Sequence, residues 1–569
     1  MNKISLGNAF NPYFARENTF SLNGLWDFDL NNGEKPDYKK KILVPFAPET
    51  EMSGINKTIK PHHMMHYRLV IDEDNEFADQ EAQIYFEAVD QICDVYWNGT
   101  FATHHEGGYW PFSIIVPHLR KGDVIELHVK DDTSSDVFAR GKQTLSPGTI
   151  WYKGTSGIWG NVYVEYLPDG FRFDKIDINA NYDKKKLIID FGHNVGDAKV
   201  EVTTPKGEVL KGKTDTYGEV IFNLADNFYP WSPEQPNLYE VEASKGKDVV
   251  HSVFGVRKIE KIEKNGMGLI ALNGKPIFLS ALLDQGYWSP KSGMTPISQE
   301  DISKELELVK TFGFNTLRKH IKIESPRWYY ECDRLGILVI QDMVNSGGKI
   351  PMARIALAPF LKLNYDDTNY KLMKRDNELS RKQFEVDMAK TVKLLNKHPS
   401  IIAWTLFNEG WGQFDSVRLT KVLKLLDDQR LVDSTSGWFD TKSGDFDSHH
   451  IYFRKPIMKN EKGRILSLSE FGGFAYAVPG HSPATKKFGY AKYGNTDKLL
   501  KAYEKCFLDD LLPMVSKEGL STIVLTQLSD VEGETNGLIT YDREVIKVKP
   551  EEMKKLNKAL FDEFNKTWN

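Results

Sequence analysis

The sequence predicts a protein of several domains, with two β-sandwiches followed by a (β/α)8 TIM barrel. A chain of 569 residues is too long for one hydrophobic core. Short strand patterns broken by Gly, Pro and Asn continue to about residue 257, and from residue 258 strands alternate with helical patterns. The first pattern is typical of sandwiches and the second of a parallel sheet. We therefore divide the chain into residues 1–167, 168–257 and 258–569.

The first region, residues 1–167, contains closely spaced strand patterns. Its clearest turn is Asn98-Gly99, which follows the run Val95–Trp97 and is typical of a two-residue hairpin loop. Further strand patterns lie at Leu22–Phe28, Tyr67–Ile71 and Gln83–Ala88. Short strands joined by such turns predict an antiparallel β-sandwich.

The second region, residues 168–257, has the size of an immunoglobulin-like sandwich. It contains no cysteine, so it lacks the disulfide that antibody domains carry between their sheets. Strands are expected at Leu187–Phe191, Ala198–Thr203, Glu219–Asn223 and Leu238–Ala243. We expect this region to act as a spacer.

The third region, residues 258–569, contains eight candidate strands separated by helical patterns, which predicts a (β/α)8 barrel. In such a barrel the chemistry belongs to the C-terminal ends of the strands. The candidate strands are Ile277–Leu283, Thr316–Arg318, Leu338–Asp342, Ile401–Asn408, Leu431–Ser436, Phe446–Ile451, Ile465–Ser469 and Ser521–Thr526.

Four helices of this region have clear signals. Ser298 and Asp301 form a capping box before the first one, and the second has Ser325 as its expected cap, Pro326 in its first turn and Gly336 after its end. Apolar periodicity predicts further helices over residues 379–397 and 498–515. Pro513 is expected to break or kink the last turn of the latter.

Charge and cysteine content exclude several classes of protein. A net charge of −5 gives no general attraction to nucleic acids or membranes. Cys93, Cys332 and Cys506 are too few and too widely spaced for a disulfide framework. The N-terminal residues do not resemble a leader, and no apolar run is long enough to span a bilayer, so we expect a soluble, cytoplasmic protein. Homo-oligomerisation stays open.

No cofactor or metal is expected. The His and Cys residues do not have the spacing of a closed zinc site, and no glycine-rich phosphate loop precedes a helix. Twelve Trp and twenty-four Tyr residues suit carbohydrate recognition, although β-rich domains use aromatic residues equally well for packing.

Two of the predicted barrel strands end in a glutamate. Glu409 follows Ile401–Asn408, and Glu470 follows Ile465–Ser469. Hydrolysis of a glycoside needs one carboxylic acid to protonate the leaving oxygen and one carboxylate to attack the sugar or activate water. A single glutamate at a strand end is more often an ordinary solvent-facing residue or part of a buried ion pair. Two such glutamates at the same edge of one barrel favour the catalytic interpretation.

The residues around both glutamates resemble glycoside hydrolase family 2, the β-galactosidase and β-glucuronidase family. The resemblance rests on Asn408-Glu409-Gly410-Trp411-Gly412 and on Ser469-Glu470-Phe471-Gly472-Gly473. It implies that Glu409 is the acid/base and Glu470 the nucleophile of a retaining enzyme, with carboxyls about 5–5.5 Å apart. A carbohydrate is the implied partner.

The resemblance extends to both β-rich regions. Residues 107–112 and 155–159 are similar to the family's N-terminal jelly roll, which we expect to support the active site rather than to act as an independent lectin. Residues 231–239 and 254–258 are similar to the family's markers for the second sandwich and its exit.

The predicted strand ends supply further candidate residues for a substrate pocket. By the resemblance, Arg318 supports the nucleophile, Asn408 bonds the 2-hydroxyl of the sugar and Tyr452 touches the nucleophile. His320 and His450 could equally be buried histidines that only orient their neighbours. The full candidate set also includes Asp284, Trp288, Asp342, Trp438 and Asp530.

The loop after the first barrel strand departs from the family. It reads Asp284-Gln285-Gly286-Tyr287-Trp288, where many members carry a turn that contains His. We expect Asp284, Tyr287 and Trp288 to set the choice of sugar, with Trp288 nearly as well explained by packing under the loop.

Two further departures leave the sugar open. The last strand lacks the Trp of many related barrels, and the Asn-x-Lys pair of β-glucuronidases has no counterpart over residues 535–543. The prediction is a retaining exo-β-glycosidase, β-galactosidase-like by default. The alternatives are an enzyme for another β-glycoside (a uronic acid, pentose, glucoside or mannoside) and a carbohydrate-binding protein without catalysis.

Overall fold

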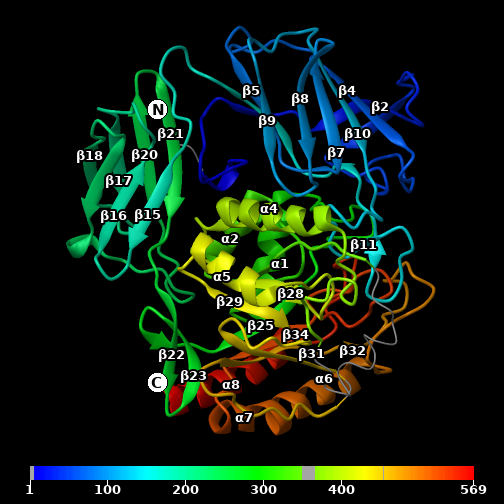
Figure 1. The fold of residues 1–569 in the computed structure, drawn as a ribbon, viewed down its shortest axis with the longest axis vertical. Helices are drawn as coiled ribbons and strands as arrows, with labels where there is room; N and C mark the ends of the chain where they lie inside the picture. The colour runs from blue at the N-terminus through cyan, green and yellow to red at the C-terminus, as the bar shows by residue number, and fades with distance from the viewer. Residues whose placement is uncertain (1–5, 349–364, 453) are drawn as a thin grey trace.

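The computed structural model describes residues 6–348, 365–452 and 454–569. These residues form two antiparallel β regions that lie side by side, with an α/β barrel beneath them (Figure 1). Each β region has its own hydrophobic core, and the largest apolar cluster surrounds the barrel strands. None of the helices in the described residues has the length and apolar composition needed to cross a bilayer.

The first β region is a sandwich of a four-stranded and a six-stranded sheet. Buried side chains such as Trp26, Tyr67 and Phe86 fill the space between the sheets. The expected hairpin at Asn98-Gly99 is confirmed, since it joins two paired strands and both turn residues have positive φ. The strands are β1 (Thr19–Ser21), β14 (Val162–Tyr166), β5 (Ala82–Phe86) and β9 (Phe112–Val116) in one sheet, and β3 (Lys40–Val44), β2 (Gly24–Asn31), β4 (Met64–Val70), β10 (Val124–Lys130), β7 (Ile92–Trp97) and β8 (Thr100–Glu106) in the other.

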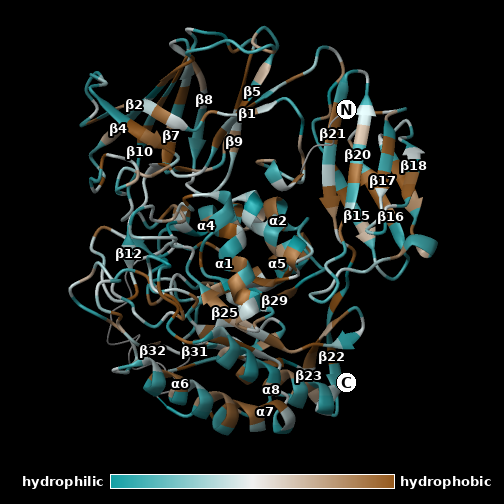
Figure 2. Ribbon diagram, turned by 180° about the vertical axis from the view of Figure 1, so that it is seen from behind, coloured by the Kyte–Doolittle hydropathy of each residue, from teal (hydrophilic) through white to brown (hydrophobic). Residues whose placement is uncertain are grey.

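The second β region is a smaller sandwich of three and four strands. Its sheets are β15 (Asp177–Asn181), β16 (Lys186–Asp190) and β19 (Glu219–Asn223), and β18 (Val209–Lys213), β17 (Lys199–Thr203), β20 (Tyr239–Lys245) and β21 (Asp248–Phe254). The four expected strands are present, whereas β15, β18 and β21 were missed. β15 and β18 are edge strands that contain no fully buried residue, while β21 is mostly buried. Figure 2 shows hydrophobic and hydrophilic residues alternating along the sandwich strands, as expected when one face of a sheet is buried.

An N-terminal arm connects the two sandwiches and the barrel. The Arg16 guanidinium, which is buried, donates to Asp248 at 2.9 Å and to Glu165 at 3.1 Å. The Tyr13 hydroxyl donates to Asp333, whose backbone oxygen accepts from the Trp231 indole at 2.8 Å. These buried polar contacts fix the relative positions of the three parts.

The eight predicted barrel strands are confirmed. They are β25 (Leu279–Asp284), β26 (Thr316–Lys319), β27 (Leu338–Asp342), β28 (Ile401–Asn408), β29 (Leu431–Ser436), β30 (Phe446–Ile451), β31 (Ile465–Gly472) and β34 (Thr522–Thr526). Parallel ladders join β25 to β29 in order and join β30 through β31 and β34 back to β25, while β29 and β30 lie in contact and close the barrel. A hairpin of β22 (Ile259–Lys264) and β23 (Met267–Leu272) pairs with the start of β31.

The first helices begin and end where the sequence signals them. α1 (Gln299–Thr311) starts with the capping box of Ser298 and Asp301, and α2 (Pro326–Leu335) ends at Gly336, which has φ +73°. Ser325 lies at the N-cap of α2 but makes no side-chain cap bond. The remaining helices are α4 (Glu378–Leu395), α5 (Ser416–Leu426), α6 (Thr496–Glu504), α7 (Leu512–Lys517) and α8 (Pro550–Trp568).

One expectation about the helices is wrong. Within the described residues, loops rather than helices connect β29 to β30 and β30 to β31.

The helix expected over residues 498–515 is interrupted just before Pro513. α6 gives way to a π-helical segment (Lys505–Leu511), and the proline lies in the first turn of α7, where it needs no backbone N–H. The helices α5 and α8 were not anticipated.

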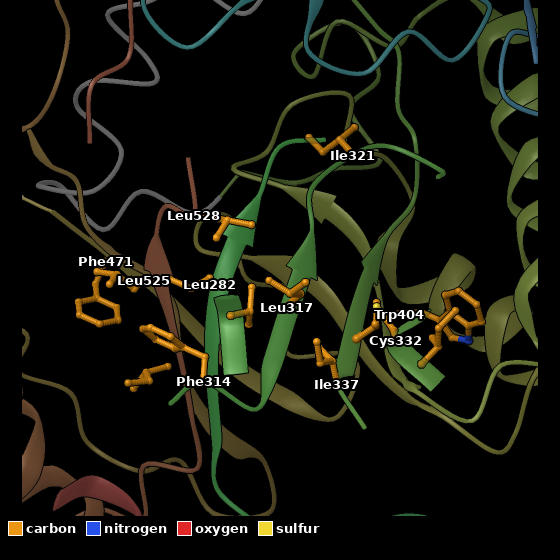
Figure 3. Packing of buried hydrophobic residues seen from close by; sticks show 14 of the residues in the cluster. Leu282, Phe314, Leu317, Ile321, Cys332, Ile337, Trp404, Phe471, Leu525 and Leu528 are labelled. Atoms are coloured by element: carbon orange, nitrogen blue, oxygen red, sulfur yellow. The ribbon is translucent and has the colours of Figure 1, made fainter. Parts of the chain in front are cut away.

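The alternation of side chains along the barrel strands decides which residues can reach the centre. Leu282, Leu317 and Trp404 belong to the cluster beneath the helices (Figure 3), whereas Ala281 and Leu283 pack with Val524 in a separate small cluster. Successive residues of a strand point to opposite faces. Arg318, which follows Leu317, is therefore directed into the barrel.

We predict that Arg16→Ala destabilises the junction between the two sandwiches by about 3–5 kcal/mol, because it leaves the carboxylates of Asp248 and Glu165 buried without their partner. Thermal unfolding and limited proteolysis measure the effect. The control is Arg172→Ala, which removes a half-exposed pair with Glu81 and should cost at most about 1 kcal/mol. Equal losses in the two variants would contradict a special role for the Arg16 contacts.

Candidate active site

The fold brings Glu409 and Glu470 together at the C-terminal ends of β28 and β31. One oxygen of each carboxyl and one ring nitrogen of His450 lie within 4.8 Å of one another. His450 Nδ1 is 2.9 Å from Glu409 Oε1 and 3.6 Å from Glu470 Oε2. His450 therefore contacts both carboxyls, as a candidate site residue should.

The position of Glu409 depends on an unusual backbone conformation. Its φ is +53°, a left-handed value that costs about 1–3 kcal/mol outside glycine and is found mainly at functional sites. Its N–H donates to Ser436 O at 2.9 Å. Gly410 follows with φ +70°, and a Cβ there would lie 2.1 Å from the Phe439 ring. The Asn-Glu-Gly sequence thus ends the strand abruptly and directs the carboxyl of Glu409 toward His450.

A bulge in β31 directs Glu470 inward. The register of β31 against β34 shifts between Leu468 and Phe471, and both of these residues pack in the cluster beneath the helices. Without the shift, residues 468 and 471 would face opposite sides of the sheet. Bulges of this kind are common next to active sites, where they re-aim a side chain.

Arg318 is the centre of a buried polar network between the strand ends. Its guanidinium donates to Glu470 Oε1 at 3.2 Å and to Asn408 Oδ1 at 2.8 Å. It also pairs with Asp342 through two contacts of 3.0 and 3.1 Å, and Asp342 Oδ2 lies 2.8 Å from His320 Nδ1. Because Asn408 accepts with its oxygen, its amide N–H groups remain to donate to a ligand.

The surroundings of Glu470 keep its carboxyl ionised. Burial raises the pKa of Glu470, but His450, Arg318, His320 and the Tyr452 hydroxyl together outweigh burial and hold that pKa below its ordinary value. The Tyr452 hydroxyl donates to Glu470 Oε2 and lies 2.9 Å from Thr526 Oγ1. A buried, ionised carboxylate with fixed donors is suited to attack an electrophile.

Trp438 lies at the edge of this group. Its ring centre is 6.4 Å from that of His450, and its indole Nε1 is buried without a hydrogen-bond partner in the part of the chain that the structure describes. A buried donor of this kind costs free energy unless a ligand or water accepts from it.

The structure does not bring Asp284 or Asp530 to the two glutamates. Side chains of β25 point alternately into and out of the barrel, and Asp284 points outward. Its carboxylate contacts Lys319 Nζ at 2.5 Å. Asp530 is paired with Lys547 at 2.5 Å, and burial raises the pKa of Asp530 to about 6. Asp284 lies at a strand end, as expected, whereas Asp530 lies in the loop after β34, and both side chains make structural ion pairs.

Trp288 is buried as well. It belongs to the barrel cluster, and the guanidinium carbon of Arg543 lies 5.9 Å from its ring centre. Its Nε1 has no hydrogen-bond partner among the described residues. Neighbouring Tyr287 packs edge-on against Tyr152 of the first sandwich, with 4.8 Å between ring centres. Packing under the loop therefore accounts for Trp288.

Residues of the first sandwich that the sequence did not single out reach the mouth of the barrel. The loop of residues 137–153 descends from the sandwich to the barrel, where Figure 1 shows its short strand β11 (Gln143–Thr144). Trp151 packs edge-on against Trp411 at 5.0 Å, and the Arg140 guanidinium lies 5.3 Å from the Trp411 ring. The backbone N–H groups of Arg140 and Gly141 donate to Asn345 O, at 3.1 Å each. The sequence of this loop contains no motif that predicts contact with the barrel, so its position is known only from the structure.

Three clusters in the described part of the chain place three metal-type ligand atoms close together. One is Glu409, His450 and Glu470, and the others are His481, Asp542 and Glu544, and Asp440, Asp447 and Glu461. Arg464 occupies the last cluster, with contacts to all three carboxylates. A structural zinc site needs four ligands, and each cluster supplies three. Proton transfer is the chemistry that the first cluster suits.

Comparisons with known proteins agree with this geometry. Residues 262–464 match the model of the TIM barrel domain of glycosyl hydrolases family 2, a range that includes Glu409. The β-galactosidase of Lactococcus lactis is 26% identical over 432 residues, which are 69% of this chain and 40% of that protein. The β-galactosidase of Priestia megaterium is 25% identical over 456 residues, 75% of this chain and 41% of that protein. The chain thus spans about two fifths of the length of these relatives.

Solved structures match almost the whole chain. A β-galacturonidase of family 2 from Eisenbergiella tayi, bound to galacturonate, covers 95% of this chain and 97% of its own, with a TM-score of 0.68 and 19% identity. A β-D-glucuronidase from Dictyoglomus thermophilum covers 96% and 98%, with a TM-score of 0.72 and 16% identity. At these identities the matches establish a shared fold. The match of the barrel model shows that residues 262–464 are similar to the TIM barrel domain of glycoside hydrolase family 2.

Proposed function

We propose that this protein is a retaining exo-β-glycosidase that hydrolyses terminal β-linked sugars through a covalent glycosyl-enzyme. The observation that carries the proposal is the closeness of Glu409 and Glu470, whose nearest oxygens lie within 4.8 Å of each other. Retaining glycosidases hold their carboxyls about 5–5.5 Å apart, whereas inverting enzymes leave about 6.5–9.5 Å for a water molecule. The shorter separation supports retention.

The roles of the two carboxyls follow from their surroundings. Glu470, held ionised by Arg318 and Tyr452, attacks the anomeric carbon as the bond to the leaving oxygen breaks, and Glu409 gives that oxygen a proton. Glu409, now ionised, then takes a proton from water, which attacks the anomeric carbon and releases Glu470. Asn408 donates to the 2-hydroxyl of the sugar, a contact that strengthens in the transition state.

The sugar is proposed by default to be galactose, since the curated relatives are named β-galactosidases. The similar structures are a β-galacturonidase and β-glucuronidases, which keeps acidic sugars and other β-glycosides as alternatives. A binding protein without catalysis would not need a fixed, ionised carboxylate beside a second carboxyl. A panel of nitrophenyl β-glycosides, assayed with the wild-type protein, tests the activity and ranks the sugars.

We also propose an assignment of the three domains. Residues 1–167 form the jelly roll, residues 168–257 the immunoglobulin-like sandwich and residues 258–569 the catalytic barrel. The separate cores of the two sandwiches support these boundaries. The contacts of Trp151 with Trp411 support a role of the jelly roll at the active site.

We predict that the two glutamate variants lose activity in different ways. Glu470→Ala removes the attacking atom and should lower kcat on the order of 10⁴-fold or more for every leaving group. Glu409→Ala should lose about 10²–10⁴-fold with leaving groups that need a proton, but should keep the first step for dinitrophenolate, which needs none. Added azide should then restore turnover of the Glu409 variant.

Covalent labelling provides an independent measurement of these roles. A 2-deoxy-2-fluoro glycosyl fluoride of the accepted sugar should label the peptide of residues 465–474, which contains Glu470. A label on Glu409, or azide rescue of Glu470→Ala in place of Glu409→Ala, would reverse the assignment.

We predict that Tyr452→Phe moves the acid limb of kcat/KM to higher pH. The pKa of Glu470 is lowered in the folded protein, so activity is lost as pH falls through that pKa. Removing the hydroxyl that bonds the carboxylate raises the pKa, and it should also lower kcat/KM about 10- to 100-fold, as expected for a hydrogen bond to a charged group.

The matched control is Tyr503→Phe. Tyr503 is fully buried, but its hydroxyl has no partner in the part of the chain that the structure describes. Its loss should leave the pH profile unchanged. An unchanged acid limb in Tyr452→Phe would show that Tyr452 does not hold Glu470 ionised.

A further inference from the structure

Lys142 belongs to the loop that the first sandwich extends to the mouth of the barrel. Its backbone oxygen accepts from Tyr152 N at 3.0 Å, next to the parallel pair of β11 and β12 (Tyr152–Lys153). Gly141, the preceding residue, has φ +59°, and a Cβ there would lie 2.6 Å from Ile321 O. The backbone that carries Lys142 is therefore held tightly against the barrel.

The side chain of Lys142 is largely buried, and its ammonium group has no carboxylate within ion-pair distance among the described residues. The residue is 9% exposed, and Nζ lies 5.5 Å from the centre of the Trp151 ring. Within the described residues it makes no ion pair or hydrogen bond through Nζ. Residues 1–5, 349–364 and 453 contain no Asp or Glu, so those parts of the sequence hold no side-chain carboxylate for it either.

The neighbouring cations of the same loop also have no carboxylate partner among the described residues, but each hydrogen-bonds backbone oxygens. The Arg140 guanidinium donates to Gln143 O at 2.7 Å and to Gly347 O at 3.3 Å. Lys153 Nζ donates to Glu49 O at 2.6 Å. These two side chains form hydrogen bonds within the protein, whereas the ammonium group of Lys142 remains available to a ligand.

The charge of Lys142 acts on the catalytic side of the barrel mouth. Burial lowers the pKa of His320, and Lys142 lowers it further against the pull of Asp342. Burial raises the pKa of Glu534, and the Tyr152 hydroxyl and Lys142 reduce this rise. His320 bonds the Asp342 that also holds Arg318, so Lys142 lies within electrostatic reach of the network around Glu470.

Resting on the proposed glycosidase function, we propose that Lys142 binds an anionic substituent, a carboxylate or a sulfate ester, on the sugar that Glu470 attacks. An ammonium group without a carboxylate partner at the mouth of the barrel can pair with an anionic substrate. The ring of Trp151 lies beside it and packs edge-on against Trp411, so aromatic side chains, which suit contact with a sugar, are close to the ammonium. The preferred substrates are then β-linked acidic sugars in place of the neutral galactose taken as the default, and a residue of the first sandwich determines this specificity.

The test compares acidic and neutral substrates in Lys142 variants. Wild type, Lys142→Met and Lys142→Arg are assayed on two groups of aryl glycosides. The acidic group contains the β-galacturonide, the β-glucuronide and the 6-sulfate of the β-galactoside. The neutral group contains the β-galactoside and the β-glucoside. We expect wild type to prefer one acidic class, which distinguishes carboxylate from sulfate. Lys142→Met should lower kcat/KM for that class at least about 30-fold and change neutral substrates less than about threefold. Lys142→Arg should keep part of the preference.

The matched control is Lys390→Met. Lys390 Nζ lies 5.3 Å from the Trp110 ring, a similar cation–aromatic contact on α4, and its loss should change neither class. Thermal unfolding checks the fold: Lys142→Met should change Tm little, because Lys142 makes no direct ion pair among the described residues and acts on Glu534 without contact. A lower Tm with equal losses on all substrates would assign Lys142 a structural role and overturn the proposal.

The outcomes separate this inference from the proposed function. Wild type could hydrolyse neutral glycosides as well as acidic ones, with an activity that requires Glu470 but not Lys142. That outcome would overturn the inference about Lys142 and leave the proposed function intact. If no glycoside is hydrolysed, the proposed function fails, and calorimetry still decides the inference. Galacturonate should bind wild type more tightly than galactose does, and that difference should disappear in Lys142→Met. An unchanged difference would overturn the role of Lys142.

Discussion

The candidate active site depends on one buried guanidinium. Arg318 on β26 bonds Asp342 at the end of β27, Asn408 at the end of β28 and Glu470 on β31, so four of the eight strand ends are held by a single side chain. Burial of a positive charge is expensive unless it is paired and fully hydrogen-bonded. Two carboxylates and an amide oxygen satisfy it here, and the same contacts keep Glu470 ionised and Asn408 correctly oriented.

Local irregularities at two strands complete the arrangement. Glu409 adopts a left-handed conformation, and β31 contains a register shift next to Glu470. Each would be unfavourable in an isolated strand, and each is held by the surrounding barrel, through the bond of Glu409 N–H to Ser436 O and through the packing of Leu468 and Phe471. Strain of this kind is retained where it places a reactive group.

The sequence predicts the barrel strands well because each is a short, continuously apolar run between turn residues, a pattern that reports burial on both faces directly. It anticipates that Glu409, Glu470, Arg318 and His450 lie close together, because strand ends converge in a barrel. It wrongly predicts that Asp284 points into the pocket, because the position of a residue at a strand end does not determine which face of the sheet its side chain occupies. In the structure the Asp284 side chain pairs with Lys319 instead. Loops in place of two helices, and the edge strands β15 and β18, likewise depend on tertiary packing that local patterns do not encode.

The contribution of the first sandwich is the least predictable part of the candidate site and the one to which we assign specificity. The barrel alone supplies the two carboxyls and the network that fixes their charge. Trp151, Arg140 and Lys142 come from a loop more than two hundred residues earlier in the chain and reach the mouth only because the sandwich docks on the barrel. In the proposed function, catalysis and recognition thus lie on separate folding units. The bonds to Asn345 O and the close approach of Gly141 to Ile321 O hold the loop against the barrel, so they would set the geometry of recognition without touching the proposed reacting groups.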